Sequence, residues 1–327
     1  NVSIHSIVWK GYEPGILPCG REFLKVVSGV EPLKMIFRSI CMTPILLAIV
    51  VAPSLAEDAS NGDRRFAESQ RFFVQSQQPT GLLIPLYHYP ANVHTNAVFN
   101  RLIELKKSFP AVPVCAIVNP ANGSGQGELD ANYVKAIDRL CGAGVVLLGY
   151  VSTRFAAQLP QQVLLDIAAW RTRYPKVSGL FLDEMANKPD DATVQYYKQA
   201  TSVGHDAGFW PVFANPGTAT PEPFFDQSAA DVFVIHENRI WPTESDLKGD
   251  YFGGYADYPP WTRAVLIHSQ KKFDRGRFAM IRKHVRWLYV THDMFDEKAD
   301  PIDPENNPWD ELSEHLEEIF RELSRQP

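Results

Sequence analysis

The 327-residue sequence has no long apolar run, no extended run of basic residues and no closely paired cysteines. A membrane-spanning helix needs about 20 consecutive apolar residues, and no stretch reaches about 18, so we expect no membrane span. The lack of Lys/Arg runs argues against nucleic acid as a partner. The formal net charge is −6 at pH 7, which favours a neutral or cationic ligand.

The four cysteines show no CxxC spacing, so the sequence does not indicate a zinc site built on cysteine. Cys19 and Cys41 lie near the N-terminus, and Cys115 and Cys141 lie in the body of the chain. In an oxidising compartment the last two can form one disulfide. Their pairing depends on geometry, so the sequence leaves it open. We expect no cofactor and no metal.

Residues 35–56 have the organisation of a secretory signal peptide. Arg38 supplies a basic start, an apolar run follows, and small residues end at Ala56, where we expect cleavage. The protein is therefore expected to be secreted or periplasmic; the alternative is a short buried helix. Residues 1–34 are interpreted as a non-native upstream extension, and residues 57–80 as a linker. Residues 57–327 have 27 Lys and Arg against 35 Asp and Glu, a net charge of −8.

From residue 81 onward, short apolar runs alternate with segments of helical periodicity. Continuous apolar runs are typical of parallel strands buried on both faces. The expected strands are 81–89, 112–119, 145–151, 178–184, 210–217, 230–237, 263–270 and 287–293. The expected helices are 91–109, 130–144, 160–174, 192–208, 275–285 and 309–326. Eight such units over roughly 250 residues predict an α/β fold, a single-domain (β/α)8 TIM barrel over residues 81–327.

Two phosphate-binding patterns are missing. The first strand-to-helix turn, "YHYPANVH", has no GxGxxG, which argues against a doubly wound open sheet, the alternative fold. The glycine-rich stretch 119–129, "NPANGSGQGEL", lacks the GK[ST] ending of a phosphate loop. We expect it to be a loop at the mouth of the barrel.

Acidic residues end two of the expected strands. Asp183 and Glu184 directly follow the apolar "GLFL", and Glu237 follows "VFVIH". Burying an unpaired carboxylate costs several kcal/mol, so a barrel has no structural reason to place acids there. The carboxyl ends of barrel strands open onto the active site, and glycoside cleavage requires two carboxyl groups beside the scissile bond. Asp190 and Asp191 instead precede a helix and are expected to cap it.

Other polar and aromatic residues are expected at the same strand ends or in the loops that follow, where they can bind substrate. Aromatic rings, with Trp210 among them, offer apolar platforms for sugar rings. The predicted substrate-binding residues are Tyr87, His88, Tyr89, Asn119, Tyr150, Thr153, Asn215, His236, Trp241, His268 and Asp293.

The motifs "IPLYHYP", "VPVCAIVNPANGSG", "GVVLLGYVSTRFA", "DIAAWRTRYPKVSGLFLDE", "FANPGT" and "VIHEN" resemble the spherulin-4 (spherulation-specific family 4) proteins over roughly residues 82–290. This resemblance implies a secreted (β/α)8 glycoside hydrolase, similar to endo-α-1,4-N-acetylgalactosaminidases that act on galactosamine-containing exopolysaccharide. It places the family's functional acids on Asp183, Glu184 and Glu237. The chain departs from the family pattern in the loop "NPANGSGQGE" and at His88, both at the expected barrel mouth.

The roles of the three acids are a hypothesis at this point. In an α-linked N-acetylhexosaminide the acetamido group is cis to the leaving oxygen, so it cannot attack from the opposite face. Asp183 is therefore expected to act as nucleophile or to stabilise the cationic transition state, with Glu237 as general acid/base and Glu184 positioning the sugar. An exchange of roles between Asp183 and Glu184 stays open.

Two other functions also stay open. A barrel metallohydrolase would bind its metal through histidines and acids at strand ends, namely His88, His236, His268, His292, Asp183 and Asp293. Against it, strand one has no HxH and strand four does not end in lysine. A secreted polysaccharide-binding barrel without catalysis would keep the aromatics but has no need of the three acids. We expect a monomer with a polysaccharide partner containing N-acetylgalactosamine or galactosamine.

Overall fold

The computed structural model describes residues 79–92, 94–250, 254–295 and 306–325. The predicted extension, the signal peptide and all but the last two residues of the predicted linker lie outside these ranges. None of the helices in the described part of the chain combines the length and apolar character needed to cross a membrane.

Eight parallel strands form a closed barrel in the order of the sequence, as predicted. Closure is made between the first and last strands, where Gly81 pairs with Trp287 and Leu82 with Leu288. The strands are β1 (Gly81–Leu86), β2 (Val114–Val118), β3 (Val146–Ser152), β4 (Gly179–Asp183), β5 (Val212–Ala214), β6 (Val232–Asn238), β7 (Arg263–Ile267) and β8 (Trp287–Val290).

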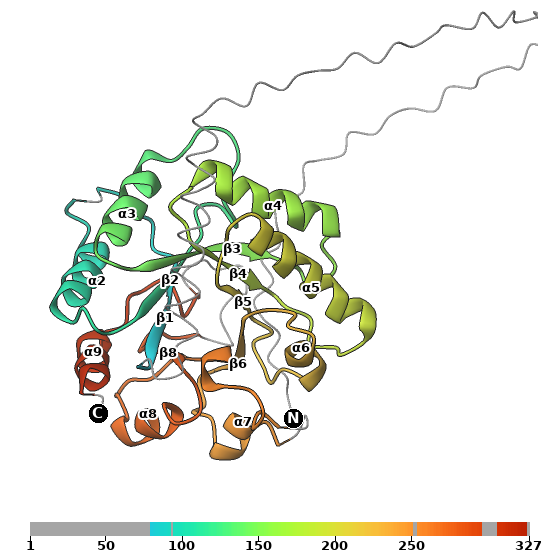
Figure 1. Ribbon diagram of the computed structural model, residues 1–327. Coiled ribbons are helices and arrows are strands. Elements are labelled where there is room, and N and C mark those ends of the chain that lie inside the picture. The colour runs from blue at the N-terminus through green and yellow to red at the C-terminus, as the bar shows by residue number, and fades with distance from the viewer. Residues whose placement is uncertain (1–78, 93, 251–253, 296–305, 326–327) are drawn as a thin grey trace, which may run out of the picture.

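Helices surround the barrel, and Figure 1 shows α9 between α2 and α8. They are α2 (Ala97–Ser108), α3 (Ala131–Gly142), α4 (Pro160–Arg173), α5 (Asp191–Asp206), α6 (Glu222–Asp226), α7 (Glu244–Lys248), α8 (Arg275–Ile281) and α9 (Leu316–Ser324), with a 3-10 turn η1 (Pro260–Thr262) before β7. Asp190 caps α5, as predicted, because its carboxylate accepts from the backbone N–H of Thr193 at 3.0 Å.

The strands are apolar because both of their faces are covered. Every residue of β1, β2, β5, β7 and β8 is buried. At the start of β4 the packing is so close that only glycine fits, since a Cβ on Gly179 would lie 2.3 Å from the carbonyl oxygen of Pro211. This tight entry fixes the register of β4 and therefore the position of the acids at its far end.

The structure corrects one expectation and answers one question that the sequence left open. The predicted helix 309–326 is wrong in its first half, because α9 begins only at Leu316. The backbone amides that would start the helix are bound by side chains of β8 and the residues after it, as described below. Cys115 and Cys141 remain thiols rather than a disulfide, and the Cys141 Sγ lies 3.6 Å from the carbonyl oxygen of Lys176.

Candidate active site

The two adjacent acids at the end of β4 bind neighbours on opposite sides. Asp183 accepts a hydrogen bond from Asn215, which follows β5, at 2.9 Å. Glu184 accepts a short hydrogen bond from the hydroxyl of Ser152, the last residue of β3. The chain separates them at Glu184, whose φ of 53° lies in the left-handed region. Such a conformation costs a non-glycine residue about 1–2 kcal/mol, so surrounding contacts must hold it.

Thr153 and Tyr197 make the contacts that hold the backbone of Asp183 and Glu184. The Thr153 Oγ1 lies 2.8 Å from the carbonyl oxygens of both Asp183 and Glu184, and 3.0 Å from the hydroxyl of Tyr197. The Tyr197 hydroxyl in turn accepts from the backbone N–H of Ala186 at 2.7 Å. Thr153 is fully buried, so the structure gives this predicted substrate-binding residue a supporting position under the β4 turn.

Asn215 bridges the acid pair, by which we mean Asp183 and Glu237. Its side-chain nitrogen donates to Asp183 Oδ1 at 2.9 Å and to Glu237 Oε2 at 2.7 Å. The Asn215 Oδ1 accepts from the backbone N–H of Gly217 at 2.9 Å, so the amide cannot be flipped without losing all three bonds. Asn215 was predicted to bind substrate, and in the structure its two amide hydrogens are used by the acids.

This shared nitrogen limits the separation of the two carboxyl groups. Their bound oxygens cannot be further apart than the sum of the two bond lengths, at most about 5.6 Å. Glycosidases that retain anomeric configuration have carboxyl groups about 5–5.5 Å apart, whereas inverting enzymes need about 6.5–9.5 Å. The upper limit for the two bound oxygens is close to the retaining range and below the inverting range.

Glu237 is directed to Asn215 by a local irregularity in β6. The β6–β7 register shifts between Val234 and His236, and this bulge re-aims the side chains that follow. A second donor holds the other oxygen, since the indole Nε1 of Trp309 donates to Glu237 Oε1 at 2.9 Å. Both carboxylate oxygens of Glu237 are thereby occupied by hydrogen-bond donors.

The acid pair has perturbed proton affinity. Burial, followed by the charge of Glu237, raises the pKa of Asp183 to about 7, although donors from the Glu184 backbone and Asn215 act in the opposite direction. Burial also raises the pKa of Glu237, against the hydrogen bonds from Asn215 and Trp309. Two close carboxylates in such a site do not both ionise readily, so the pair holds about one proton near neutral pH.

Tyr87 and Tyr150 lie beside the acid pair. Burial and then the charges of Asp183 and Glu237 raise the pKa of the Tyr87 hydroxyl well above its usual value. The pKa of Tyr150 is raised by burial and by the charge of Asp183, to which its hydroxyl is hydrogen-bonded. The two rings meet edge to face with centroids 6.0 Å apart. Both phenols therefore stay protonated and can donate hydrogen bonds.

The remaining predicted substrate-binding residues make local contacts in the structure. Tyr89 donates to Asp130 at 2.9 Å, and Asn119 accepts from the backbone N–H of Gly123 at 2.7 Å, which fixes the glycine-rich loop. Trp241 is buried and donates to Gln270 at 2.6 Å. The Asp293 carboxylate accepts from the backbone N–H groups of Met294 and Glu311. His88 is partly buried.

The four strand-end histidines do not converge. His236 Nε2 lies 2.7 Å from the carbonyl oxygen of Ile240, and His268 Nδ1 lies 2.9 Å from Ser269 Oγ. His292 faces Glu311 and Glu314 at 3.4 and 3.6 Å. Within the described ranges, no group of three or more His, Cys, Asp or Glu side chains is arranged to hold a metal ion. The metallohydrolase alternative therefore has no ligand set in this part of the chain.

Trp309 and Ser152 are the contacts of the acids that sequence reasoning missed. Ser152 ends β3 and directly precedes the predicted site residue Thr153, and this position was a usable signal. Trp309 lies 72 positions after Glu237, in a segment read as part of a helix. The preceding Asn307-Pro308 is a turn signal that favours a later helix start, but nothing local indicates the partner of the indole.

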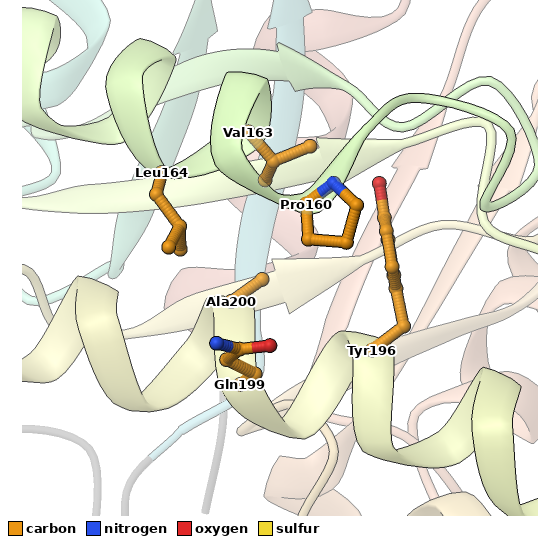
Figure 2. A pocket seen from close by; sticks show the side chains of 6 residues that line it. All are labelled: Pro160, Val163, Leu164, Tyr196, Gln199 and Ala200. Atoms are coloured by element: carbon orange, nitrogen blue, oxygen red, sulfur yellow. The ribbon is translucent and has the colours of Figure 1, made fainter. Parts of the chain in front are cut away.

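An apolar hollow elsewhere on the molecule does not belong to this site. It is a shallow hollow between α4 and α5. Figure 2 shows its lining residues, Pro160, Val163, Leu164, Tyr196, Gln199 and Ala200. It contains no carboxylate, and its phenol donates to the carbonyl oxygen of Gln158, so it offers no catalytic group.

Fold and site together define the class of protein, a (β/α)8 barrel whose strand ends present a bridged pair of buried carboxyl groups. Within that class the chain belongs to spherulation-specific family 4, whose model matches residues 81–323.

The chain is similar to two known proteins, one in sequence and one in structure. Spherulin-4 of Physarum polycephalum is 28% identical over 207 residues, which cover 63% of this chain and 56% of that protein. The match thus spans little more than half of that relative. The crystal structure of Aspergillus clavatus Sph3 in complex with GalNAc is 24% identical, with a TM-score of 0.59, and covers 76% of this chain and 99% of that one. This second likeness shows the fold.

Proposed function

We propose that this protein is a retaining, endo-acting glycoside hydrolase that cleaves α-1,4-linked polymers of N-acetylgalactosamine and galactosamine. The observation that carries the proposal is the bridging of Asp183 and Glu237 by one amide nitrogen, which limits their bound oxygens to a separation of at most about 5.6 Å. Family membership and the fold shared with a GalNAc-bound protein support the choice of sugar.

In the proposed first step Asp183 attacks the anomeric carbon, while the glycosidic oxygen leaves with the proton of Glu237. The product is a glycosyl ester on Asp183. In the second step Glu237 takes a proton from water, the water oxygen attacks the anomeric carbon, and the ester bond to Asp183 breaks. Two inversions restore the α configuration and return both acids to their starting states.

The single proton of the acid pair must sit on Glu237 when substrate is bound. The leaving oxygen accepts a hydrogen bond from protonated Glu237, and the positive charge that develops at the anomeric carbon stabilises ionised Asp183. Once Glu237 is protonated, its charge no longer raises the pKa of Asp183. Substrate thus selects the proton distribution that the reaction needs.

Glu184 is proposed to position the sugar. It lies at the end of the same strand as Asp183 but is held by Ser152 rather than Asn215, so it faces the side of β3. A carboxylate there can accept hydrogen bonds from sugar hydroxyls or pair with the ammonium group of galactosamine. The hydroxyl of Tyr87, which lies beside the acid pair, can add a phenolic donor.

The activity is tested by incubating purified protein with a partially deacetylated α-1,4-GalNAc polymer and analysing the products by mass spectrometry. New reducing-end oligosaccharides of several lengths are expected. Binding of the polymer without new reducing ends would instead support the non-catalytic binding barrel.

The roles of the acid pair are tested with azide and an aryl α-GalNAc substrate. Asp183→Ala opens the face opposite the leaving group, so azide should yield the β-glycosyl azide. Glu237→Ala leaves the glycosyl ester for azide to attack, which should yield the α-glycosyl azide. Opposite products from the two variants would mean that the roles of Asp183 and Glu237 are exchanged.

We also propose that residues 35–56 direct export. N-terminal sequencing of the protein recovered outside the cytoplasm should begin at Glu57. A mature N-terminus that retains these residues would contradict this proposal.

A further inference from the structure

Trp309 reaches the acid pair from outside the eight β–α units. It lies in the segment 306–315, between β8 and α9, yet its indole Nε1 donates to Glu237 Oε1 at 2.9 Å. The side chain is 7% exposed. The barrel alone would leave this carboxylate oxygen without the donor.

The segment that carries Trp309 is fastened to the last two strands. The backbone N–H of Ser313 donates to the Tyr289 hydroxyl at 2.8 Å, and that of Glu311 donates to Asp293 Oδ2 at 3.1 Å. The His315 Nε2 lies 2.6 Å from the carbonyl oxygen of Gln270. These bonds replace the first turn of the predicted helix, and they hold the indole against the barrel.

Two rings fix the plane of the indole. Tyr289 lies with its ring centroid 6.3 Å from that of Trp309, and His268 meets it nearly edge to face at 5.6 Å. A buried ring held on two sides has little rotational freedom, so the direction of its N–H is set before substrate arrives.

We propose that Trp309 is a positioning residue that holds Glu237 Oε1 and so fixes the orientation of the carboxyl group that carries and transfers the catalytic proton. This inference rests on the function proposed above. Indole is a donor only, so Oε1 must offer it a lone pair in both protonation states of Glu237, and the ionised carboxylate accepts this hydrogen bond more strongly.

The first test compares wild type with Trp309→Phe, which keeps a buried ring but removes the N–H. We expect kcat to fall on the order of 10- to 100-fold with little change in KM, because the displaced acid acts in the transition state. The alkaline limb of the kcat/KM profile should move up by about one pH unit, since a donor that favoured ionised Glu237 is gone. Trp261→Phe, in η1 at the opposite end of the barrel, is the matched control and should change neither.

A second readout does not depend on activity. In a ¹⁵N–¹H spectrum the Trp309 indole signal, assigned by its loss in Trp309→Phe, should shift with pH at the midpoint of Glu237. That shift should vanish in Glu237→Gln. If Trp309→Phe does not fold, the indole signal is assigned by its nuclear Overhauser contacts with the Tyr289 ring, and the spectra of wild type and Glu237→Gln still decide the proposal.

The outcomes separate this inference from the proposed function. Absence of hydrolysis by the wild type, with the indole signal titrating as described, would overturn the hydrolase but leave the Trp309–Glu237 contact standing. An indole chemical shift that does not change when Glu237 ionises would overturn the positioning role. Unchanged kcat and pH profile in a folded Trp309→Phe would also overturn it.

Discussion

Replacing Asp183 with Asn should make the protein more stable at neutral pH while abolishing hydrolysis. Burial and the Glu237 charge raise the pKa of Asp183 from its usual value near 3.8 to about 7 in the folded state. A charged Asp183 is therefore a cost to folding. Asn keeps an oxygen that can accept from Asn215, and it removes the charge that Asp183 would carry near Glu237.

The magnitude follows from the size of the shift. Below pH 4 the acid is protonated in both folded and unfolded states, so it contributes no difference. Between pH 4 and 7 the folded state holds the proton more tightly, and the stability of the wild type falls as pH rises. About three pKa units at 1.36 kcal/mol each give a cost of about 4 kcal/mol above pH 7.

Urea unfolding followed by tryptophan fluorescence checks this expectation at pH 5, 6, 7 and 8. Asp183→Asn should unfold at a higher urea concentration than wild type at pH 8, by about 1 M, and the gap should narrow steadily towards pH 5. Asp206→Asn, at an exposed position on α5, is the control and should show no such trend. A variant no more stable than wild type at pH 8, or a gap independent of pH, would refute the electrostatic reasoning.

Three further results are expected. Asn215→Ala should lower kcat at least about 100-fold in steady-state assays, because Asp183 and Glu237 lose the donor that spaces them; wild-type kcat would show the bridge to be dispensable. The kcat/KM of the wild type should fall as pH rises through about 7, where the acid pair loses its last proton; a rate that stays flat to pH 9 would contradict a shared proton. Gly179→Ala should lose about 2 kcal/mol or more of stability in urea melts, since its Cβ would lie 2.3 Å from the Pro211 oxygen; an unchanged melt would mean that β4 shifts freely.

The barrel was predictable because its signals are local. Each strand is a short apolar run, and six of the eight are followed by a segment of helical period, so the order of these elements could be predicted without knowing any contact. The short helices α6 and α7, after β5 and β6, were not predicted. The ends of the elements were less well defined. The strand expected at 210–217 is only Val212–Ala214, and the residues beyond it, including Asn215, form the turn that carries the bridging amide.

The main residues of the site could be predicted from the sequence, but the hydrogen bonds between them could not. Asp183, Glu237 and Asn215 all stood at expected strand ends, yet the sequence cannot say that one amide binds both acids. The divergence of Asp183 and Glu184 depends on a left-handed φ at Glu184, a conformation that residue type alone does not favour.

Trp309 could not be assigned from sequence for a related reason. The amphipathic pattern of residues 309–326 is real, but tertiary bonds to Tyr289, Asp293 and His292 compete with the first helical turn and prevail. Long-range partners of this kind have no periodicity to reveal them. They become visible only when the barrel brings β6, β8 and the following segment together.

The most direct test of the central claim is the anomeric configuration of the first product. ¹H NMR recorded during hydrolysis of the α-1,4-GalNAc polymer should show new reducing ends appearing as the α anomer and converting to the β anomer only by mutarotation. Asp183→Asn and Glu237→Gln should release none. New ends that appear first as the β anomer would contradict the account of a closely spaced retaining pair, and undiminished release by either variant would contradict the assignment of the two acids.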